Sequence, residues 1–345
     1  MAAVIDRTDF ILGKEVSDFE NEYALYSETK FCVGVANGLD ALKICLRCLD
    51  IGKGDEVIVP ANTYIATILA VLEVGATPIF IEPDNNTYNI IAANIAPAIT
   101  AKTKAVIPVH LYGQPCDMAG IATLCKQHAL YIIEDNAQAQ GGRFNNQLTG
   151  SFGQINATSF YPSKNLGAMG DAGGITTNDA ALADKARVLR NVGSSVKYQH
   201  KLTGYNSRLD TLQAVVLSSK LPYLNEWNNE RKQIAARYLH NLKDCATIVL
   251  PGLIAGAEHV YHLFVIRHQQ RDKLQQYLLQ HGIQTLIHYP IPPHLQPALA
   301  ELNYKAGDFP FTEALAQTCL SLPLFVGMTE EQIDFVSEKI ISFGA

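Results

Sequence analysis

The chain has 345 residues, of which 48% are hydrophobic and 17% are charged, as in a globular protein with a large core. Its formal net charge of −6 indicates no basic face for nucleic acid or for an anionic membrane. Seven scattered cysteines predict a reducing cytoplasm rather than a disulfide framework. We find no signal peptide and no apolar run of about 18 residues, so we expect no membrane span.

The first third of the chain predicts alternating strands and helices. Residues 14–50 indicate a helix, a strand at 31–35 and a second helix that opens after Ala36-Asn37-Gly38. A polar and glycine turn between a strand and a helix N-terminus can bind an anion, although many α/β proteins contain one. Cys45 and Cys48 fall on the apolar pattern of this helix, which favours a buried face over a metal site.

A similar pattern follows at residues 56–81. The strand predicted at 56–60 precedes a helix that ends near residue 74, and another strand is expected at 77–81. Thr63 is a candidate N-cap of the helix. Tyr64 fits either a core position or a contact with a cofactor.

One acidic and one amide side chain follow the end of a later strand. A strand is expected at 104–110 and a helix at 121–128, and the apolar run from Tyr131 then ends in Asp135 and Gln138. Open α/β sheets bind ligands at the carboxyl ends of their strands. Asp135 could equally be a helix cap or a solvated loop acid.

The segment 160–174 contains one lysine, Lys164, between Pro162 and a turn rich in glycine. An amine in such a place becomes a nucleophile, and forms a Schiff base, when nearby cations or desolvation lower its pKa. A solvated loop lysine is the alternative. Strands are expected on both sides, at 157–161 and 174–177.

The remaining chain predicts a long helix and a smaller α+β region. A helix is expected at 181–191, and another opens within 204–210 and continues past Pro222 to about residue 243. We place the domain boundary in this helix, with a large domain at 1–225 and a small one at 226–345. Strands are expected at 262–267 and 284–288, and helices at 271–281, 312–319 and 329–341. His288 and His294 lack a carboxylate or cysteine to complete a metal site, so no metal is predicted.

Several of these segments resemble one family, the DegT-type nucleotide-sugar aminotransferases. The lysine segment is similar to its motif Ser-Phe-x-x-x-Lys-Asn-Leu-Gly-x-x-Gly-Asp-Ala-Gly, and residues 110–118, 134–140 and 204–209 match further motifs. The resemblance implies an aspartate-aminotransferase-like fold (PLP fold type I), with a mixed, mainly parallel seven-stranded sheet and a smaller C-terminal α+β domain. Strand–helix alternation by itself supports the α/β class. A Rossmann dehydrogenase is excluded because no G-x-G-x-x-G follows the first strand.

The resemblance also implies a cofactor, pyridoxal 5'-phosphate (PLP), with its amino form PMP as an intermediate. Lys164 would carry PLP and move the proton, Asp135 would pair with the pyridinium nitrogen, and Gln138 would face the phenolic oxygen. The other implied cofactor contacts are Asn37, Gly38, Leu39, Tyr64, Ser159 and Asn206. Asn206 would reach the phosphate of a neighbouring subunit, which implies a homodimer with shared sites. The candidate substrate contacts are Tyr161, Lys197, Arg208, His288 and Tyr289.

The implied reaction passes an amino group from L-glutamate to a keto sugar carried on a nucleotide. Gln114 and the segments 10–16, 34–42 and 285–292 resemble members that aminate C3 of dTDP-linked 6-deoxyhexoses, so the expected product is a dTDP-3-amino-3,6-dideoxyhexose. A C4 aminotransferase acting on a nucleotide-linked 4-keto-6-deoxyhexose is one alternative, and a non-catalytic PLP-binding regulatory protein is another. Lys164 argues against the dehydratase branch, which has histidine there. Gln140 stands where many relatives have histidine.

Overall fold

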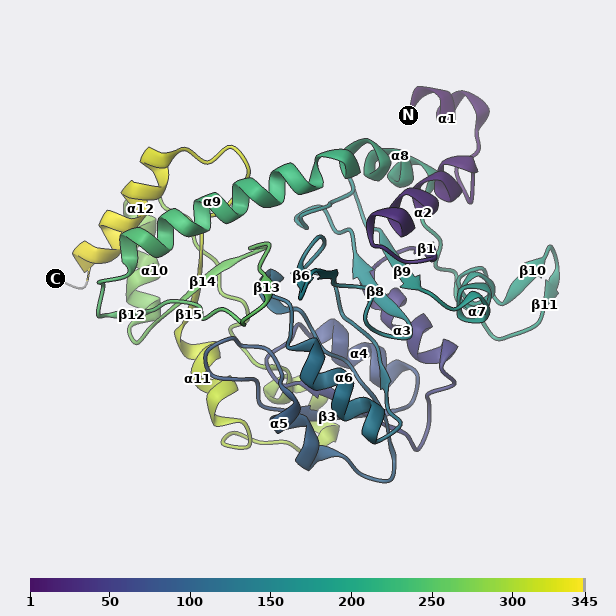
Figure 1. Ribbon diagram of the computed structural model, residues 1–345, viewed down its shortest axis with the longest axis horizontal. Helices are drawn as coiled ribbons and strands as arrows, with labels where there is room; N and C mark the ends of the chain where they lie inside the picture. Colours follow the sequence, from purple (N-terminus) through teal and green to yellow (C-terminus); the bar gives the residue numbers. More distant parts are fainter. Residues whose placement is uncertain (344–345) are drawn as a thin grey trace.

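A seven-stranded sheet forms the centre of the computed structural model, which describes residues 1–343 (Figure 1). All neighbouring pairs are parallel except those of β9, which runs antiparallel to β8 and β1, and a parallel bridge between Asp135 and Ala157 joins the two halves. The predicted mixed, mainly parallel sheet is therefore confirmed. In spatial order its strands are β3 (Thr77–Ile81), β2 (Glu56–Pro60), β4 (Thr103–Val106), β5 (Tyr131–Ile132), β8 (Asn156–Ser159), β9 (Gly173–Thr177) and β1 (Phe31–Val35).

Helices cover both faces of this sheet, which explains why strands such as β2 carry apolar side chains on both faces. In β2, Val57 and Val59 pack with one hydrophobic cluster while Ile58 packs with another. The first cluster lies under α3 (Gly38–Cys48), α4 (Ile65–Glu73) and α7 (Ala180–Arg190). The opposite face is covered by α5 (Ala92–Ile95), α6 (Met118–Gln127), α2 (Lys14–Tyr26) and α8 (Thr211–Lys220).

The C-terminal part builds a second hydrophobic core around a three-stranded antiparallel sheet. Pro222 lies in a 3₁₀ turn, Leu221–Tyr223, that joins α8 to the long helix α9 (Leu224–Leu242), so the α-helical hydrogen bonding is interrupted at this proline. The boundary at 225/226 stays a prediction. The elements here are β12 (Ile248–Val249), β14 (Phe264–His268), β15 (Cys319–Leu322), α10 (Arg271–Gln280), α11 (Pro310–Thr318) and α12 (Glu330–Phe343).

Three elements differ from the sequence-based expectations. The strand expected at 104–110 ends at Val106, two residues before Pro108, and Val109 forms an isolated bridge to Asp135. The strand expected at 284–288 is wrong: Leu286 forms a single bridge to Ser321, which belongs to the unpredicted strand β15. The helix expected to open within 204–210 begins at Thr211.

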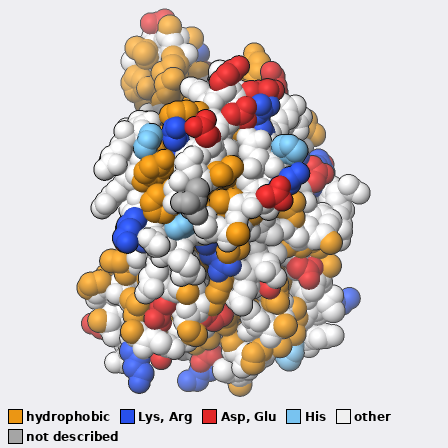
Figure 2. Space-filling view, turned by 90° about the vertical axis from the view of Figure 1, so that its left-hand side faces the viewer, with side chains coloured by type: hydrophobic (Ala, Val, Ile, Leu, Met, Phe, Trp, Pro, Cys, Tyr) orange, Lys and Arg blue, Asp and Glu red, His pale blue; other side chains and the backbone are white. Residues whose placement is uncertain are grey.

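Two segments project from the body. The hairpin of β10 (Ser194–Val196) and β11 (Gln199–His200) extends at one side, and α1 (Ala2–Arg7) stands at the top (Figure 1). The top of Figure 2 shows a projection that is largely apolar, whereas basic and acidic side chains mix on the face below it. The large apolar residues exposed in the N-terminal segment are Met1, Ile5, Phe10, Ile11 and Leu12. Within residues 1–343, no helix is long and apolar enough to cross a membrane.

Candidate active site

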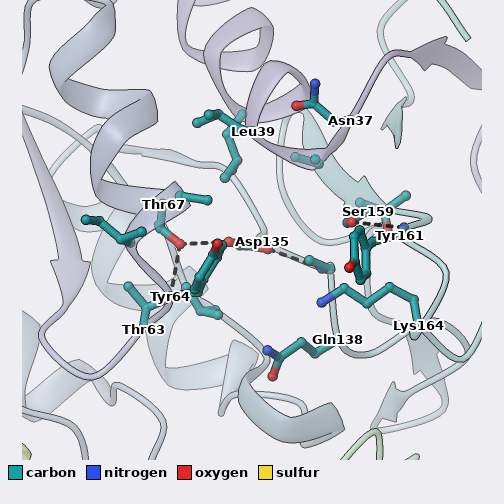
Figure 3. Close-up of a pocket in the computed structure, with 18 of the residues that line it drawn as sticks. Asn37, Leu39, Thr63, Tyr64, Thr67, Asp135, Gln138, Ser159, Tyr161 and Lys164 are labelled. Atoms are coloured by element: carbon teal, nitrogen blue, oxygen red, sulfur yellow. Dashed lines mark hydrogen bonds between the residues drawn. The ribbon is translucent and has the colours of Figure 1, made fainter. Parts of the chain in front are cut away.

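A cavity of about 590 Å³ opens at the carboxyl ends of the parallel strands (Figure 3). This is the edge at which open α/β sheets bind ligands. The structure brings most of the predicted site residues together there. Those that line the cavity are Asn37, Gly38, Leu39, Tyr64, Asp135, Gln138, Ser159, Tyr161, Lys164, His288 and Tyr289.

Asp135 lies just beyond β5 and is only 7% exposed. One carboxylate oxygen, Oδ2, accepts a hydrogen bond of 2.9 Å from the Thr67 hydroxyl, and Oδ1 accepts one of 3.2 Å from the amide of Ala137. Burial raises the pKa of Asp135, while the two hydrogen bonds and the nearby Lys164 oppose that rise. A cationic partner in the cavity would therefore stabilise the ionised form of Asp135.

Lys164 lies on the loop between β8 and β9 and points into the cavity towards Asp135 and Gln138 (Figure 3). The loop is held by backbone hydrogen bonds of 2.8 Å from Lys164 to Tyr161 and from Ala168 to Phe160. At Gly167 a Cβ atom would lie 2.4 Å from the carbonyl oxygen of Pro162, so the turn requires glycine. Desolvation lowers the pKa of Lys164 to about 8, with Asp135 opposing the shift.

The N-terminus of α3 forms a cradle beside Lys164. Asn37 is the N-cap, and its side chain accepts a 2.8 Å hydrogen bond from the amide of Asp40. The amides of Gly38 and Leu39 belong to the first helical turn, which has no intrahelical acceptors. A Cβ atom on Gly38 would approach that of Ser159 to 2.7 Å, so glycine keeps this space open. Unpaired amides with the positive end of the helix dipole suit a phosphate.

Gln138 is oriented by partners on both sides of its amide. Its Oε1 accepts a 2.6 Å hydrogen bond from the amide of Tyr112, so Nε2 is the donor and contacts the hydroxyl of Tyr289 at 3.1 Å. The ring centroids of Tyr289 and Tyr64 lie 5.3 Å apart. Tyr64 is 54% exposed. Thr63 is not the N-cap of α4, because Tyr64 occupies that position and the Thr63 hydroxyl contacts Thr67 instead.

Comparison with known proteins identifies the family. Residues 1–341 match the model of the DegT/DnrJ/EryC1/StrS aminotransferase family. The chain belongs to this aminotransferase family.

Relatives of this aminotransferase include enzymes named for amino-sugar synthesis. It is 51% identical over 344 residues, all of this chain and 94% of the other, to dTDP-3-amino-3,6-dideoxy-alpha-D-galactopyranose transaminase of Aneurinibacillus thermoaerophilus. It is 48% identical, over 98% of this chain and 90% of the other, to UDP-N-acetyl-3-dehydro-alpha-D-glucosamine 3-aminotransferase of Acidithiobacillus ferrooxidans. A Geobacillus stearothermophilus relative, 46% identical over 99% of this chain and 92% of its own, is called a pleiotropic regulatory protein.

Solved structures show the same fold with its cofactor. DesV of S. venezuelae, in complex with a ketimine intermediate, superposes with a TM-score of 0.98 at 44% identity, covering 99% of this chain and 92% of its own. Other solved structures of this fold are described as a PLP form and as complexes with PMP. PLP is therefore the cofactor of this aminotransferase.

The cavity of this chain fits that cofactor group by group. The cradle of Gly38, Leu39 and Ser159 suits the phosphate, and the buried carboxylate of Asp135 suits the protonated ring nitrogen. Lys164 would supply the amine, and the second hydrogen on Gln138 Nε2 would be available to the phenolic oxygen.

Three predicted site residues do not line this cavity. Lys197 lies in the turn that joins β10 to β11, and its amine lies 5.2 Å from the ring centroid of Tyr198. Asn206 forms a strand-like bridge with Asn191, and Arg208 donates to the side-chain oxygens of both. Asn206 therefore lies in an extended segment before α8, not at the opening of a helix.

Two glutamines that we singled out in the sequence are structural. Gln114 is 2% exposed and donates to the carbonyls of Thr87 and Gly252 while accepting from the amide of Ile254. Gln140 is fully buried and donates to the carbonyl of Ser159. Neither lines the cavity, so any effect on the substrate is indirect.

Sequence reasoning missed further lining residues, among them Thr67 and His262. Thr67 follows Thr63 by one helical turn, a spacing that could have suggested a shared face. His262 had no local signal. Among residues 1–343, no group of three or more histidine, cysteine, aspartate or glutamate side chains is arranged to hold a metal.

Proposed function

We propose that this aminotransferase moves an amino group from L-glutamate to C3 of a nucleotide-linked 3-keto sugar. The preferred substrate is a dTDP-3-keto-6-deoxyhexose, and the product is a dTDP-3-amino-3,6-dideoxyhexose. The observation that carries this proposal is the 51% identity, over the whole chain, to a transaminase named for that class of product. The Acidithiobacillus ferrooxidans relative is named for a UDP-linked sugar that is also aminated at C3. The relatives therefore support C3 as the reacting carbon better than they support dTDP as the nucleotide.

The chain's own residues have distinct tasks in this reaction. When bound, PLP accepts the amino group and spreads the negative charge that develops on the reacting carbon. Lys164 holds the cofactor and then, as a free amine of lowered pKa, accepts and returns the proton. Asp135 holds the ring nitrogen protonated, and Gln138 orients the ring from its other side.

The sugar would lie over the exposed face of the cofactor. Tyr161 is 55% exposed at the rim, and Tyr289 presents its hydroxyl next to Gln138. His288 is oriented by a 2.8 Å hydrogen bond between its Nδ1 and the Ser321 hydroxyl. A C3 and a C4 ketone need different placements of the sugar, and polar side chains left unpaired by the wrong isomer provide discrimination.

The nucleotide requires cations that the cavity does not contain. Among its lining residues, all within the described part of the chain, Lys164 is the only lysine or arginine. We infer that Lys197, Asn206 and Arg208 complete the cavity of a second copy in a homodimer. The projecting hairpin and the exposed apolar N-terminal segment support such an interface.

We place this dimer in the cytoplasm. All seven cysteines are free thiols, and six of them are buried. Burial raises the pKa values of Cys45 and Cys48, which lie on the inner face of α3 as the sequence predicts. A reducing compartment suits such a chain.

The regulatory alternative has one relative in its favour, the pleiotropic regulatory protein. Retention of Lys164, Asp135 and Gln138 in one cavity favours catalysis. Turnover of L-glutamate with a keto-sugar acceptor would exclude a purely regulatory role, and its absence with every acceptor would support that role.

Kinetics with positional isomers test the proposed reaction. We expect the purified enzyme to have a higher kcat/KM for dTDP-3-keto-6-deoxyglucose than for the 4-keto isomer, with L-glutamate as donor and the product identified by mass spectrometry. The matching UDP-linked 3-keto sugar separates the choice of nucleotide from the choice of carbon. An equal or higher kcat/KM for the 4-keto isomer would show that the enzyme acts at C4.

A further inference from the structure

An ion pair on α3 lies beside the phosphate cradle without lining the cavity. The Lys43 ammonium group lies 2.6 Å from Asp40 Oδ1 and 2.9 Å from Oε2 of Glu73, the last residue of α4. The side chains of Asp40 and Lys43 are mostly buried, whereas that of Glu73 is 46% exposed. None of these charges has a task in the reaction described so far.

Asp40 lies in the first turn of α3, directly after Leu39 of the cradle. The Cα–Cβ bonds of a helix tilt towards its N-terminus, so the Asp40 carboxylate lies on the side of the cradle. Its Oδ2 lies 3.4 Å from Nδ2 of the N-cap Asn37, which lines the cavity. The Asn37 Oδ1 in turn accepts a hydrogen bond from the Asp40 amide. Asp40 therefore holds the N-cap in its orientation.

The negative charge of Asp40 has two opposed effects. A carboxylate in the first turn interacts favourably with the helix dipole and so stabilises α3. The same charge repels a phosphate bound at the amides of Gly38 and Leu39, because both anions lie at one positive helix end. An uncompensated Asp40 would therefore weaken the cradle.

Lys43 is held where its positive charge compensates that of Asp40. The two residues are three positions apart on α3, a spacing that places them on one face of the helix. The ammonium group also lies 5.1 Å from the ring centroid of Tyr205. Burial lowers the pKa of Lys43, but the hydrogen bonds to Asp40 and Glu73 outweigh burial and raise that pKa above its usual value. Lys43 is therefore charged at neutral pH.

We propose that Lys43 sets the affinity of the cradle for the cofactor's phosphate by neutralising the carboxylate of Asp40. Lys43 does not line the cavity, so it is a positioning residue that acts through Asp40. Asp40 keeps the N-cap in place, and Lys43 cancels the repulsion that its charge would exert on the phosphate. This role concerns PLP alone and goes beyond the proposed sugar reaction.

Charge substitutions measure the role of Lys43 as a change in affinity. Lys43→Met keeps most of the side chain and removes its charge, so we expect the affinity of the cofactor-free protein for PLP to fall about tenfold in an absorbance titration. The affinity for pyridoxal, which lacks the phosphate, should not change. The double variant Asp40→Asn/Lys43→Met lacks both charges, and its affinity for PLP should return to within about threefold of the wild type.

Lys185→Met is the matched control. Lys185 pairs at 2.6 Å with Asp50, which lies just beyond the C-terminal end of α3. An 11-residue helix is about 16 Å long, which exceeds the Debye length of about 10 Å at 0.1 M salt. The loss of this charge should therefore leave the affinity for PLP unchanged.

Three results would overturn the proposal. Lys43→Met might bind PLP as tightly as the wild type does, which would show that the charge of Asp40 does not act on the cradle. Equal losses of affinity for PLP and pyridoxal, without rescue by Asp40→Asn, would show that Lys43 only packs α3. Asp40→Asn alone keeps Lys43 and should bind PLP at least as tightly as the wild type, so weaker binding would contradict the proposal even if Lys43→Met does not fold. Because no turnover is measured, each result is distinct from a failure of the proposed sugar reaction.

Discussion

Replacing Thr67 by valine tests how the cavity holds its buried carboxylate. The hydroxyl of Thr67 lies 2.9 Å from Asp135 Oδ2 and the residue is only 1% exposed. Valine has nearly the same shape as threonine, so the substitution removes one hydrogen-bond donor without opening a cavity.

The expected effect follows from the charge on Asp135. A hydrogen bond to a charged group contributes about 1.5–3 kcal/mol, and about 1.4 kcal/mol corresponds to a factor of ten. We therefore expect the affinity of Thr67→Val for PLP to fall about 10- to 100-fold. The same hydrogen bond lowers the pKa of Asp135 against the effect of burial, so its loss raises that pKa further. Asp135 would then become protonated at a higher pH, and the acidic limb of kcat/KM should move upwards in pH.

Absorbance titration of the cofactor-free protein with PLP measures the affinity. Thr63→Val is the control, because the Thr63 hydroxyl contacts Thr67 Oγ1 at 3.0 Å and forms no hydrogen bond with Asp135 within residues 1–343. Its affinity should fall about tenfold or less, as for a neutral hydrogen bond. Thermal unfolding of both cofactor-free variants checks that they fold. If Thr67→Val binds PLP as tightly as the wild type and keeps its acidic limb, the reasoning is wrong.

Three further predictions concern other parts of the site. The rate at which PLP attaches to the cofactor-free protein should rise with pH around a midpoint near 8, since Lys164 is nucleophilic only as the free amine; a midpoint near 10.5, followed by stopped-flow absorbance, would contradict this. Gly38→Ala should weaken binding of PLP about tenfold or more, because overpacking costs about 1–3 kcal/mol and the added Cβ would lie 2.7 Å from that of Ser159; equal affinity for the non-phosphorylated pyridoxal serves as the control, and unchanged affinity for PLP would refute the cradle. Mixed dimers of Lys164→Ala and Asn206→Asp should regain part of the activity that both parents lack, and a fully active monomer in sedimentation would exclude shared sites.

Local patterns predicted the strands and helices that carry the site. The run from Phe31 to Val35, the turn at Asn37 and Gly38 and the following helix are each decided by residues close in sequence, and the structure confirms them. The strand Cys319–Leu322 was missed because its pairing with β14 comes from a segment more than 50 residues away. Its short apolar run directly after a helix reads as the end of that helix.

The cavity's main carboxylate and amine were predicted, but their supporting contacts were not. Gln138 and Tyr289 meet across 151 positions of sequence, and His262 meets Asn165 across 97. Which of these side chains meet depends on how the C-terminal part packs on the sheet. The hydrophobic periodicity of a short segment does not predict that packing. Gln114 shows the converse, since its match to relatives drew attention to a side chain that is buried in backbone contacts.

The attachment of the cofactor to Lys164 is the claim on which the account depends most. The protein loaded with PLP is reduced with borohydride, digested and analysed by peptide mass spectrometry. We expect the cofactor on the peptide that contains Lys164, and no labelling in Lys164→Ala, which should still fold because the Lys164 side chain lines the cavity and belongs to no hydrophobic core cluster. Cofactor found on another lysine of the wild-type protein would contradict the account.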